Sequence, residues 1–200
     1  MTALQKLYFI TIICLFSNSL IAQDSLYNRR IGLVVKTDIL ATALAPVVSQ
    51  SYSYSLAVEK LIEKKQSFQL AGYYNYFNYN IYSPHSKYRS FQVIPEYRFY
   101  LNKKNWHKGI YCGVYSGLID QHEFIPNENY DYRKRFIELG GLGGYQIYFF
   151  KHLAVDLLFG FGGSRVIYYK FVKYAHNFQS SERLYYLDGR LSLNIGYVFY

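Results

Sequence analysis

Apolar and polar side chains alternate with a period of two along most of this chain, and its last residues show the pattern most clearly. In "RLSLNIGYVFY", residues 190–200, an apolar side chain occupies every second position from Leu191 to Phe199. This period indicates a β-strand whose two faces lie in different environments. Chain ends normally fray unless other parts of the fold hold them, so we expect the final strand to be held by pairing within a sheet.

Eight segments carry this alternation, and turn residues separate them. The segments are 31–43, 51–62, 67–79, 89–101, 109–120, 134–149, 153–168 and 184–200. The connections 63–66, 102–108 and 150–152 are short, whereas 44–50, 80–88, 121–133 and 169–183 are mostly longer and more polar. Short turns at one end and long loops at the other are typical of outer-membrane barrels. The sequence therefore predicts an all-β chain, folded as an eight-stranded antiparallel up-and-down transmembrane β-barrel.

Ionised side chains keep to one face of the predicted strands. In the fourth segment, for example, Glu96 and Arg98 share a face, and Tyr97 lies on the other. A lipid-facing Arg or Lys at the bilayer midplane costs roughly 2 to 4 kcal/mol, so the charged face must point inward. Because side chains fill the interior of a barrel this narrow, we expect a packed polar lumen without a wide pore. The predicted lumen network consists of Lys36, Asp38, Glu59, Glu96, Arg98, Glu138, Asp156 and Arg190.

Tyr and Phe are over-used, with 25 and 15 residues in a chain of 200. Membrane barrels carry aromatic girdles at both interfaces of the bilayer. The alternative, a soluble sheet with these aromatics in its core, would bury more Tyr hydroxyls than a domain of this size could readily satisfy. The predicted girdle consists of Tyr74, Tyr76, Tyr97, Phe99, Tyr148, Phe149, Tyr197 and Phe199.

The N-terminus has the features of a secretory signal. Lys6 precedes an apolar run over residues 7–16, and Ala22 offers a small residue for cleavage. This run is much shorter than the ~20 residues of a membrane helix. We therefore expect residues 1–22 to be a signal peptide and residues 23–200 to form one outer-membrane barrel domain. The remaining cysteine, Cys112, is expected to be a small buried residue.

Catalytic and metal-binding motifs are weak. Metal-ligand spacing is lacking among His85, His107, His122, His152 and His176, so neither a metal nor a cofactor is predicted. His85 and Ser86 alone hint at the nucleophile and base of a lipase. "GGLGG" and "FGFGG" depart from the dinucleotide fingerprint, and we interpret their glycines as room for bulky lumen neighbours.

We accordingly expect a protein that is not an enzyme. Two alternatives stay open. One is a lipid-modifying barrel enzyme of the lipid A deacylase or acyltransferase type, and the other is a soluble periplasmic barrel that binds a ligand.

Basic side chains gather at the end with the long loops, which the topology places outside the cell. The outer leaflet there is anionic, so they are candidate contacts for lipopolysaccharide phosphates; the alternative is ordinary solvated loop charge. The predicted partners are thus outer-membrane lipid and lipopolysaccharide, and nucleic acid is not expected. The candidate contacts are Lys87, Arg89, Arg133, Lys134, Arg135, Lys170, Lys173 and Arg183.

Several motifs together cover almost all of the mature chain. They are "VVKTDILATALAP", "FQVIPEYRFYLNK", "GGLGGYQIYFFKHLAVDLLFGFG" and the aromatic final strand. With these the chain resembles the small eight-stranded barrels of the OmpA and OmpX kind, and more closely an outer-membrane family of the Bacteroidota whose function is unknown. The resemblance implies an integral outer-membrane protein. We expect a monomer, inserted by the barrel-assembly machinery.

Pro95 departs from the pattern, because it falls inside the fourth segment. A closed barrel has no free edge, and a missing N–H breaks the hydrogen-bond ladder. We expect either a β-bulge at this position or local hydration from the lumen.

Overall fold

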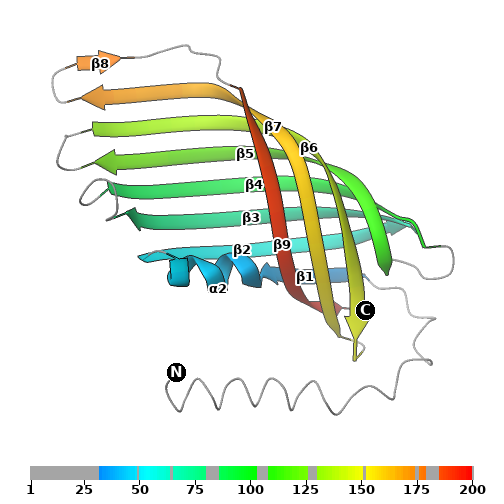
Figure 1. Cartoon of the computed structure of the whole chain (residues 1–200). Coiled ribbons are helices and arrows are strands. Elements are labelled where there is room, and N and C mark those ends of the chain that lie inside the picture. The colour runs from blue at the N-terminus through cyan, green and yellow to red at the C-terminus, as the bar shows by residue number, and fades with distance from the viewer. Residues whose placement is uncertain are drawn as a thin grey trace, which may run out of the picture.

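The computed structural model describes residues 32–48, 50–63, 65–79, 86–102, 108–125, 130–150, 152–173, 176–178 and 185–199. The expected signal peptide, residues 1–22, lies outside these ranges. The elements are β1 (Leu33–Asp38), α2 (Ile39–Val48), β2 (Gln50–Glu63), β3 (Gln66–Tyr79), β4 (Ser86–Tyr100), β5 (Gly109–Ile125), β6 (Tyr130–Phe149), β7 (Leu153–Lys173), β8 (His176–Phe178) and β9 (Tyr185–Phe199). All the described strands belong to one sheet (Figure 1).

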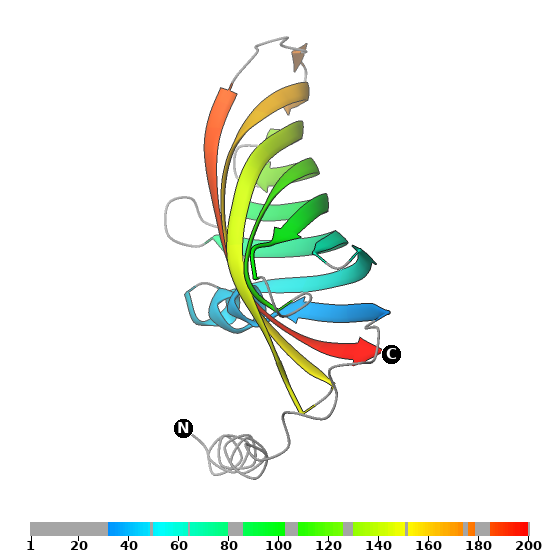
Figure 2. The ribbon, with the colours of Figure 1, turned by 90° about the vertical axis from the view of Figure 1, so that its right-hand side faces the viewer.

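Eight of these strands close into a ring. Each strand from β1 to β7 pairs antiparallel with the next one along the chain. β9 then pairs with β7 on one side and with β1 on the other, where Phe199 lies opposite Leu33. Figure 2 shows the curvature of the sheet from one end. The predicted all-β, eight-stranded, antiparallel up-and-down architecture is therefore confirmed; β8 pairs only with the end of β7.

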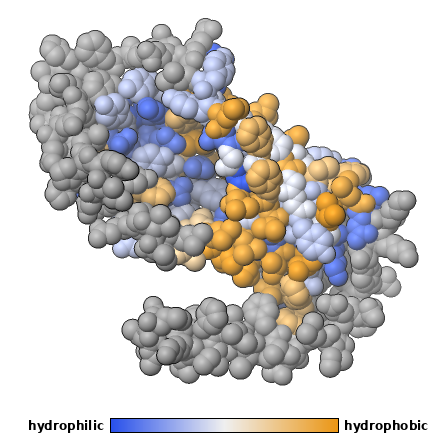
Figure 3. All heavy atoms as spheres, in the orientation of Figure 1, coloured by the Kyte–Doolittle hydropathy of each residue, from blue (hydrophilic) through white to orange (hydrophobic). Residues whose placement is uncertain are grey.

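The alternation along each strand separates two kinds of side chain. On β2, Ser51, Ser53 and Glu59 are buried on the inner face, whereas Tyr54 and Leu56 are exposed on the outer face. Hydrophobic residues gather over β7 and β9 in Figure 3, with hydrophilic residues nearer the two ends. We call the exposed outward-facing apolar side chains the apolar band. It includes Leu56, Leu70, Phe91, Val114, Leu118, Ile137, Leu139, Leu157, Phe159 and Leu191.

The first strand is shorter than the alternation predicts. A strand was expected over 31–43, but β1 ends at Asp38 and α2 follows directly. The Asp38 carboxylate accepts hydrogen bonds from the backbone N–H groups of Leu40 and Ala41, at 3.0 and 3.2 Å. These bonds cap the helix N-terminus, and the Ala- and Leu-rich sequence that follows favours a helix. No helix in the described part of the chain is long and apolar enough to cross a membrane.

The hairpins at the other end are longer than predicted. Residues 121–133 and 169–183 were expected to be loops, but β5 continues to Ile125, β6 begins at Tyr130 and β7 continues to Lys173. The polar residues of these extended hairpins do not need to pack against an apolar surface. Their composition therefore resembles that of a loop. The consequence is that most of the basic residues predicted in these loops lie on strands with a defined facing.

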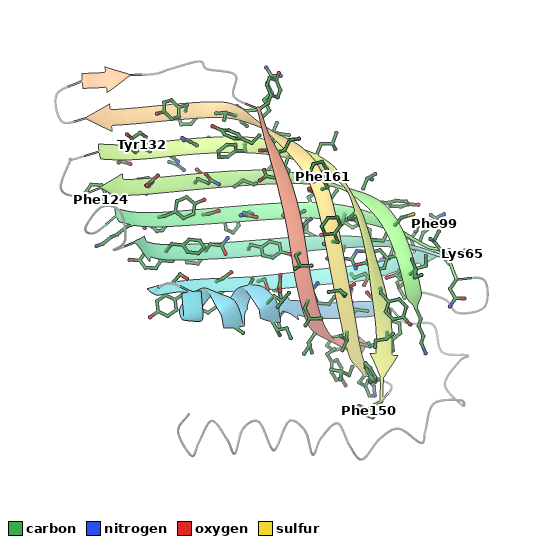
Figure 4. The ribbon with its side chains drawn as sticks, in the orientation of Figure 1. Lys65, Phe99, Phe124, Tyr132, Phe150 and Phe161 are labelled. Atoms are coloured by element: carbon green, nitrogen blue, oxygen red, sulfur yellow. The ribbon has the colours of Figure 1, made fainter. Side chains whose placement is uncertain are left out.

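Labelled side chains in Figure 4 mark the two ends of the sheet. Phe124 and Tyr132 lie where β5 and β6 approach their connection, and Lys65, Phe99 and Phe150 lie at the opposite end. The short turns of the chain therefore share one end, as the spacing of the segments predicts.

Two smaller expectations differ from the structure. Of the two alternatives expected at Pro95, the bulge does not occur: β4 pairs with β3 without a register shift, and its pairing with β5 stops at residues 94 and 95 and resumes in the same register. The missing N–H therefore interrupts the ladder without adding a residue. Cys112 is exposed rather than buried, because it occupies the outward parity of β5 with Val114.

Candidate functional site

A network of ionised groups fills the lumen at the end near the short turns. The ammonium of Lys36 on β1 lies 2.6 Å from the Glu59 carboxylate on β2 and 2.9 Å from the Asp156 carboxylate on β7, and all three side chains are fully buried. Lys36 also donates a hydrogen bond of 2.6 Å to Gln146 on β6. One cation therefore joins four strands.

Arg98 on β4 extends this network across the lumen. Its guanidinium lies 2.8 Å from Asp156 and 2.6 Å from Glu96, with a further N–H···O bond of 3.0 Å to Glu96. Arg190 on β9 reaches the second oxygen of Glu96 at 3.0 Å. Buried charge is costly unless it is paired and hydrogen-bonded. Here each of the two central carboxylates contacts two cations, so that cost is offset within the lumen.

Tyrosine hydroxyls complete the hydrogen bonding of the carboxylates. Tyr111 donates to Asp156 at 2.6 Å, and Tyr100 donates to Glu59 at 2.8 Å. Tyr115 donates to Glu138 at 2.8 Å. These tyrosines were not among the predicted lumen residues. Their positions in the strand alternation could have identified them, because Tyr100, for example, lies on the same face of β4 as Glu96 and Arg98.

Glycines of β6 and β7 make room for these rings. A Cβ at Gly140 would lie 2.5 Å from the ring of Tyr115, and one at Gly162 would lie 2.6 Å from its hydroxyl. A Cβ at Gly144 would meet the Tyr111 hydroxyl. The inward glycines of "GGLGG" and "FGFGG" therefore supply space in the lumen.

The predicted lumen residues have three different surroundings. Six of them, Lys36, Glu59, Glu96, Arg98, Asp156 and Arg190, belong to the connected network. Asp38 is buried but does not join it; the assignment to the ion network is corrected, because its carboxylate caps α2. Glu138 is held by Tyr115 and has no ion-pair partner among the described residues.

The predicted girdle residues lie mostly on the outer face. Tyr74, Tyr97, Phe99, Tyr197 and Phe199 are exposed there. By strand alternation Tyr76 and Phe149 take the same face.

Tyr148 is a correction to the predicted girdle. Its hydroxyl accepts a hydrogen bond of 2.5 Å from Gln146, and its ring packs against buried Val34, Ala154 and Val198. It therefore faces the interior, as alternation requires for a residue adjacent to outward Phe149.

The basic residues at the end of the barrel with the longer connections lie on two different faces of the sheet, some on the outer face and some on the inner face. Arg89, His122, Arg133 and Lys170 are directly paired in one row across β4 to β7, so their side chains share the outer face. Lys87 and Arg135 are exposed on that face too. Lys134 points inward, with its ammonium 5.5 Å from the ring centroid of Tyr169. The side chain of Lys173 and all of Arg183 lie outside the described residues.

An open groove of about 470 Å³ follows this row on the outer face. Arg133 donates two hydrogen bonds to Asp120, at 3.1 and 2.7 Å, and Arg135 lies 3.4 Å from the same carboxylate. The bond from Arg133 is the main reason that the pKa of Asp120, which lies beyond the apolar band, is below its usual value. The groove is lined by Tyr74, Arg89, Ser90, Phe91, Asp120, His122, Asp131, Arg133, Tyr168 and Lys170.

The charges of the acidic and basic side chains in the groove do not neutralise one another completely. His122 lies 2.5 Å from Asp131, so both carboxylates of the groove already have partners. Within the described part of the chain, neither Arg89 nor Lys170 has an ion-pair partner. The groove therefore presents two cations, Arg89 and Lys170, without a direct ionic contact among the described residues.

The groove does not have the geometry of an esterase site. Ser90 pairs with Gln121 and is buried on the inner face, whereas His122 lies on the outer face, so the two side chains point in opposite directions. Of the predicted pair His85 and Ser86, the histidine and the serine side chain lie outside the described residues. Among the described residues, no group of three or more His, Cys, Asp or Glu side chains is placed to hold a metal ion.

Comparisons with known proteins give a family and no nearer relative. A family model described as "Protein of unknown function (DUF3575)" matches residues 8–199 of the 200-residue chain. The comparisons with curated proteins and with solved structures found no match. Since the match spans nearly the whole chain and all of the ring described above, the chain belongs to the DUF3575 family.

Proposed function

We propose that this protein is an integral outer-membrane β-barrel with a structural or surface-interaction role. The observation that carries the proposal is the sidedness of the sheet. Charged side chains such as that of Arg98 are buried inside the barrel, whereas the side chains of Leu139, Phe159 and Leu191 are 69%, 63% and 65% exposed on its outer face. An exterior of this kind is unfavourable in water and matches the hydrocarbon of a bilayer.

The filled lumen supports a role other than transport. Arg98 on β4 reaches Asp156 on β7, and Lys36 on β1 reaches the same carboxylate. Side chains from opposite parts of the ring therefore meet inside it, and the glycines leave room for tyrosine rings rather than for a channel. We propose that the lumen stabilises the barrel and does not conduct ions.

The two alternatives receive less support. A soluble ligand-binding barrel has an apolar interior and a polar exterior, and the sidedness here is the reverse. A lipid-modifying enzyme needs a nucleophile within reach of a base, and Ser90 and His122 lie on opposite faces. We therefore propose a protein without catalytic activity, delivered to the membrane by the barrel-assembly machinery.

Membrane fractionation tests the proposed location. The full chain is expressed with its N-terminal residues in a Gram-negative host, and the envelope is separated on a sucrose gradient. We expect the protein in the outer-membrane fraction, and we expect it to stay there after extraction with carbonate. Recovery in the soluble periplasmic fraction without detergent would favour the ligand-binding alternative and overturn the proposal.

Planar bilayers test the filled lumen separately. Purified protein is inserted from detergent, with a porin as the positive control for insertion and detection. We expect no stepwise conductance from this protein. Regular steps of uniform size would contradict a lumen closed by its own side chains.

A further inference from the structure

The outer face changes from apolar to charged along three adjacent strands, at one level on β5 and β6 and one residue pair later on β4, where Phe91 lies opposite Asp120. Two residues along each strand, in the direction of the longer connections, Phe91 is followed by Arg89 on β4 and Leu118 by Asp120 on β5. On β6 the same step leads from Ile137 to Arg135. In a membrane barrel a coordinated change of this kind marks the boundary between hydrocarbon and lipid headgroups. The groove therefore begins where headgroups would lie.

The free cations of the groove stand in one row. Arg89 and Lys170 flank His122 and Arg133 on four neighbouring strands, and neighbouring strands lie about 4.8 Å apart. Neither acid of the groove makes an ion pair with these two cations: Asp120 pairs with Arg133, and Asp131 is hydrogen-bonded to His122. An anionic group that enters the groove therefore meets an Arg and a Lys that are not already engaged within the described residues.

We propose that this groove binds the phosphate group of a membrane lipid in the leaflet that faces the longer connections. This inference rests on the membrane location proposed above. The guanidinium of Arg89 offers the forked donors that fit phosphate oxygens, and Lys170 offers a point charge.

The apolar wall beneath the row identifies the occupant as a lipid rather than free phosphate. Phe91 is 54% exposed directly next to the charged row, and Leu118 and Ile137 are 58% and 46% exposed beyond Asp120 and Arg135. Acyl chains can lie along these side chains while the phosphate contacts Arg89 and Lys170. Inorganic phosphate would use the row alone and would gain nothing from the apolar wall.

The test compares two lipids that differ only in phosphate. Purified full-chain protein in detergent is titrated with diphosphorylated lipid A and with the same lipid after phosphatase treatment, and bound lipid is measured by native mass spectrometry. Removing the phosphate removes its charge-assisted hydrogen bonds, so we expect the phosphorylated lipid to bind at least about tenfold more tightly. Equal binding of the two lipids would overturn the proposal without any variant.

Matched double variants locate the site. Arg89→Gln with Lys170→Gln removes both free cations and should abolish the preference for the phosphorylated lipid. Lys60→Gln with Lys65→Gln removes two charges at the opposite end of the barrel and should preserve it. An equal loss in both double variants would show that the preference reflects general positive charge, and so would contradict a site in the groove.

Competition by free phosphate and fractionation of the protein complete the test. We expect millimolar inorganic phosphate not to displace bound lipid; full displacement would show a site for free phosphate and overturn the lipid assignment. Fractionation of the unmodified protein is run in parallel. A membrane protein that does not distinguish the two lipids refutes the groove alone, whereas a soluble protein refutes the proposed location.

Discussion

Lumen interactions from three other strands, β1, β4 and β5, converge on the Asp156 side chain. Its carboxylate contacts Lys36 at 2.9 Å and Arg98 at 2.8 Å, and it accepts a hydrogen bond from Tyr111 at 2.6 Å. An isolated buried carboxylate would be strongly unfavourable, and its partners remove that cost. The energetic consequence of any substitution here therefore depends on which group is left without a partner, rather than on the net value of a pair.

Arg98→Ala should be strongly destabilising, because it leaves Glu96 with only Arg190 and Asp156 with only Lys36 as cationic partners. We expect a loss of about 3 to 5 kcal/mol in the free energy of unfolding, measured by denaturant titration in detergent micelles. Arg135→Ala is the control, since Arg135 is about half exposed and exposed pairs contribute little. Equal unfolding midpoints for the two variants would show that the lumen charges are solvated.

Gly140→Ala should destabilise the barrel by overpacking. The added Cβ would lie 2.5 Å from the Tyr115 ring and 2.6 Å from the backbone oxygen of Phe161, and overpacking costs about 1 to 3 kcal/mol. Gly189→Ala is the matched control, because no atom lies within 4 Å of its added Cβ. Thermal unfolding of both variants in the same detergent measures the difference, and an equally stable Gly140→Ala would mean that Tyr115 does not occupy the lumen.

Alternation alone predicts the inner face of the charged residues but not their partners. Lys36, Glu59 and Arg98 are placed correctly from sequence, because a strand offers only two faces and one of them is apolar. Tyr111 is missed, since a tyrosine suits either environment. Tyr148 is misplaced for the same reason: an aromatic near a strand end resembles a girdle residue unless its parity is compared with that of Gln146.

At the scale of elements, the structure departs from a regular barrel where β1 ends. Residues 50–56 of β2 pair with β3 only, and residues 185–193 of β9 pair with β7 only. α2 contacts both of these strands beyond Asp38, as Figure 1 shows for β2. A helix satisfies its own backbone hydrogen bonds, so it can follow a strand without needing a ladder partner on either side.

Substitution of Asp38 should loosen α2 specifically. Asp38→Ala removes the acceptor for the amides of Leu40 and Ala41, and loss of an N-cap costs about 0.5 to 2 kcal/mol. Asp38→Asn keeps an acceptor oxygen and should lose much less. Amide hydrogen exchange of Leu40 and Ala41 in both variants is the measurement; unchanged protection in Asp38→Ala would contradict the capping role.

Element boundaries are harder to predict from this sequence than element type. The stretch after Asp38 keeps an apolar character that suits a strand or a helix, and only the cap distinguishes them. The extensions of β5, β6 and β7 mix charged residues such as Asp131, Arg133 and Lys170 with aromatic and apolar ones, so the period-two signal weakens although the ladder continues. The groove could not be predicted for this reason, because it depends on Arg89, Arg133 and Lys170 lying in one strand row.

For the barrel as a whole, the apolar band determines whether its outer face is more favourable in water or in the hydrocarbon of a bilayer. Leu157 lies on the outer face of β7, within the apolar band. Leu157→Arg should cost roughly 2 to 4 kcal/mol if that face contacts lipid, and Leu157→Ala should be nearly neutral because no core packing is lost. The amount of protease-resistant protein in membranes measures both variants. Equal amounts would show that the outer face does not contact hydrocarbon.

Closure of the ring depends on the final strand. Deletion of residues 195–200 removes every pair between β1 and β9 except Asp38 with Asn194, and an open edge in hydrocarbon leaves unsatisfied backbone groups. Phe199→Ala should impair assembly more than Tyr200→Ala, because Phe199 is on the outer face. Assembled protein is quantified for each variant after export. A larger defect for Tyr200→Ala would contradict the facing of the last strand.

Electrophoretic mobility without boiling tests the closed membrane barrel most directly. A closed barrel resists unfolding by detergent at room temperature and migrates as a compact species, and boiling converts it to the mobility of an unfolded chain. We predict that the full chain extracted from membranes shows this shift and that the chain lacking residues 195–200 does not. The same mobility for the full chain before and after boiling, or a shift retained by the truncated chain, would contradict closure through β1 and β9.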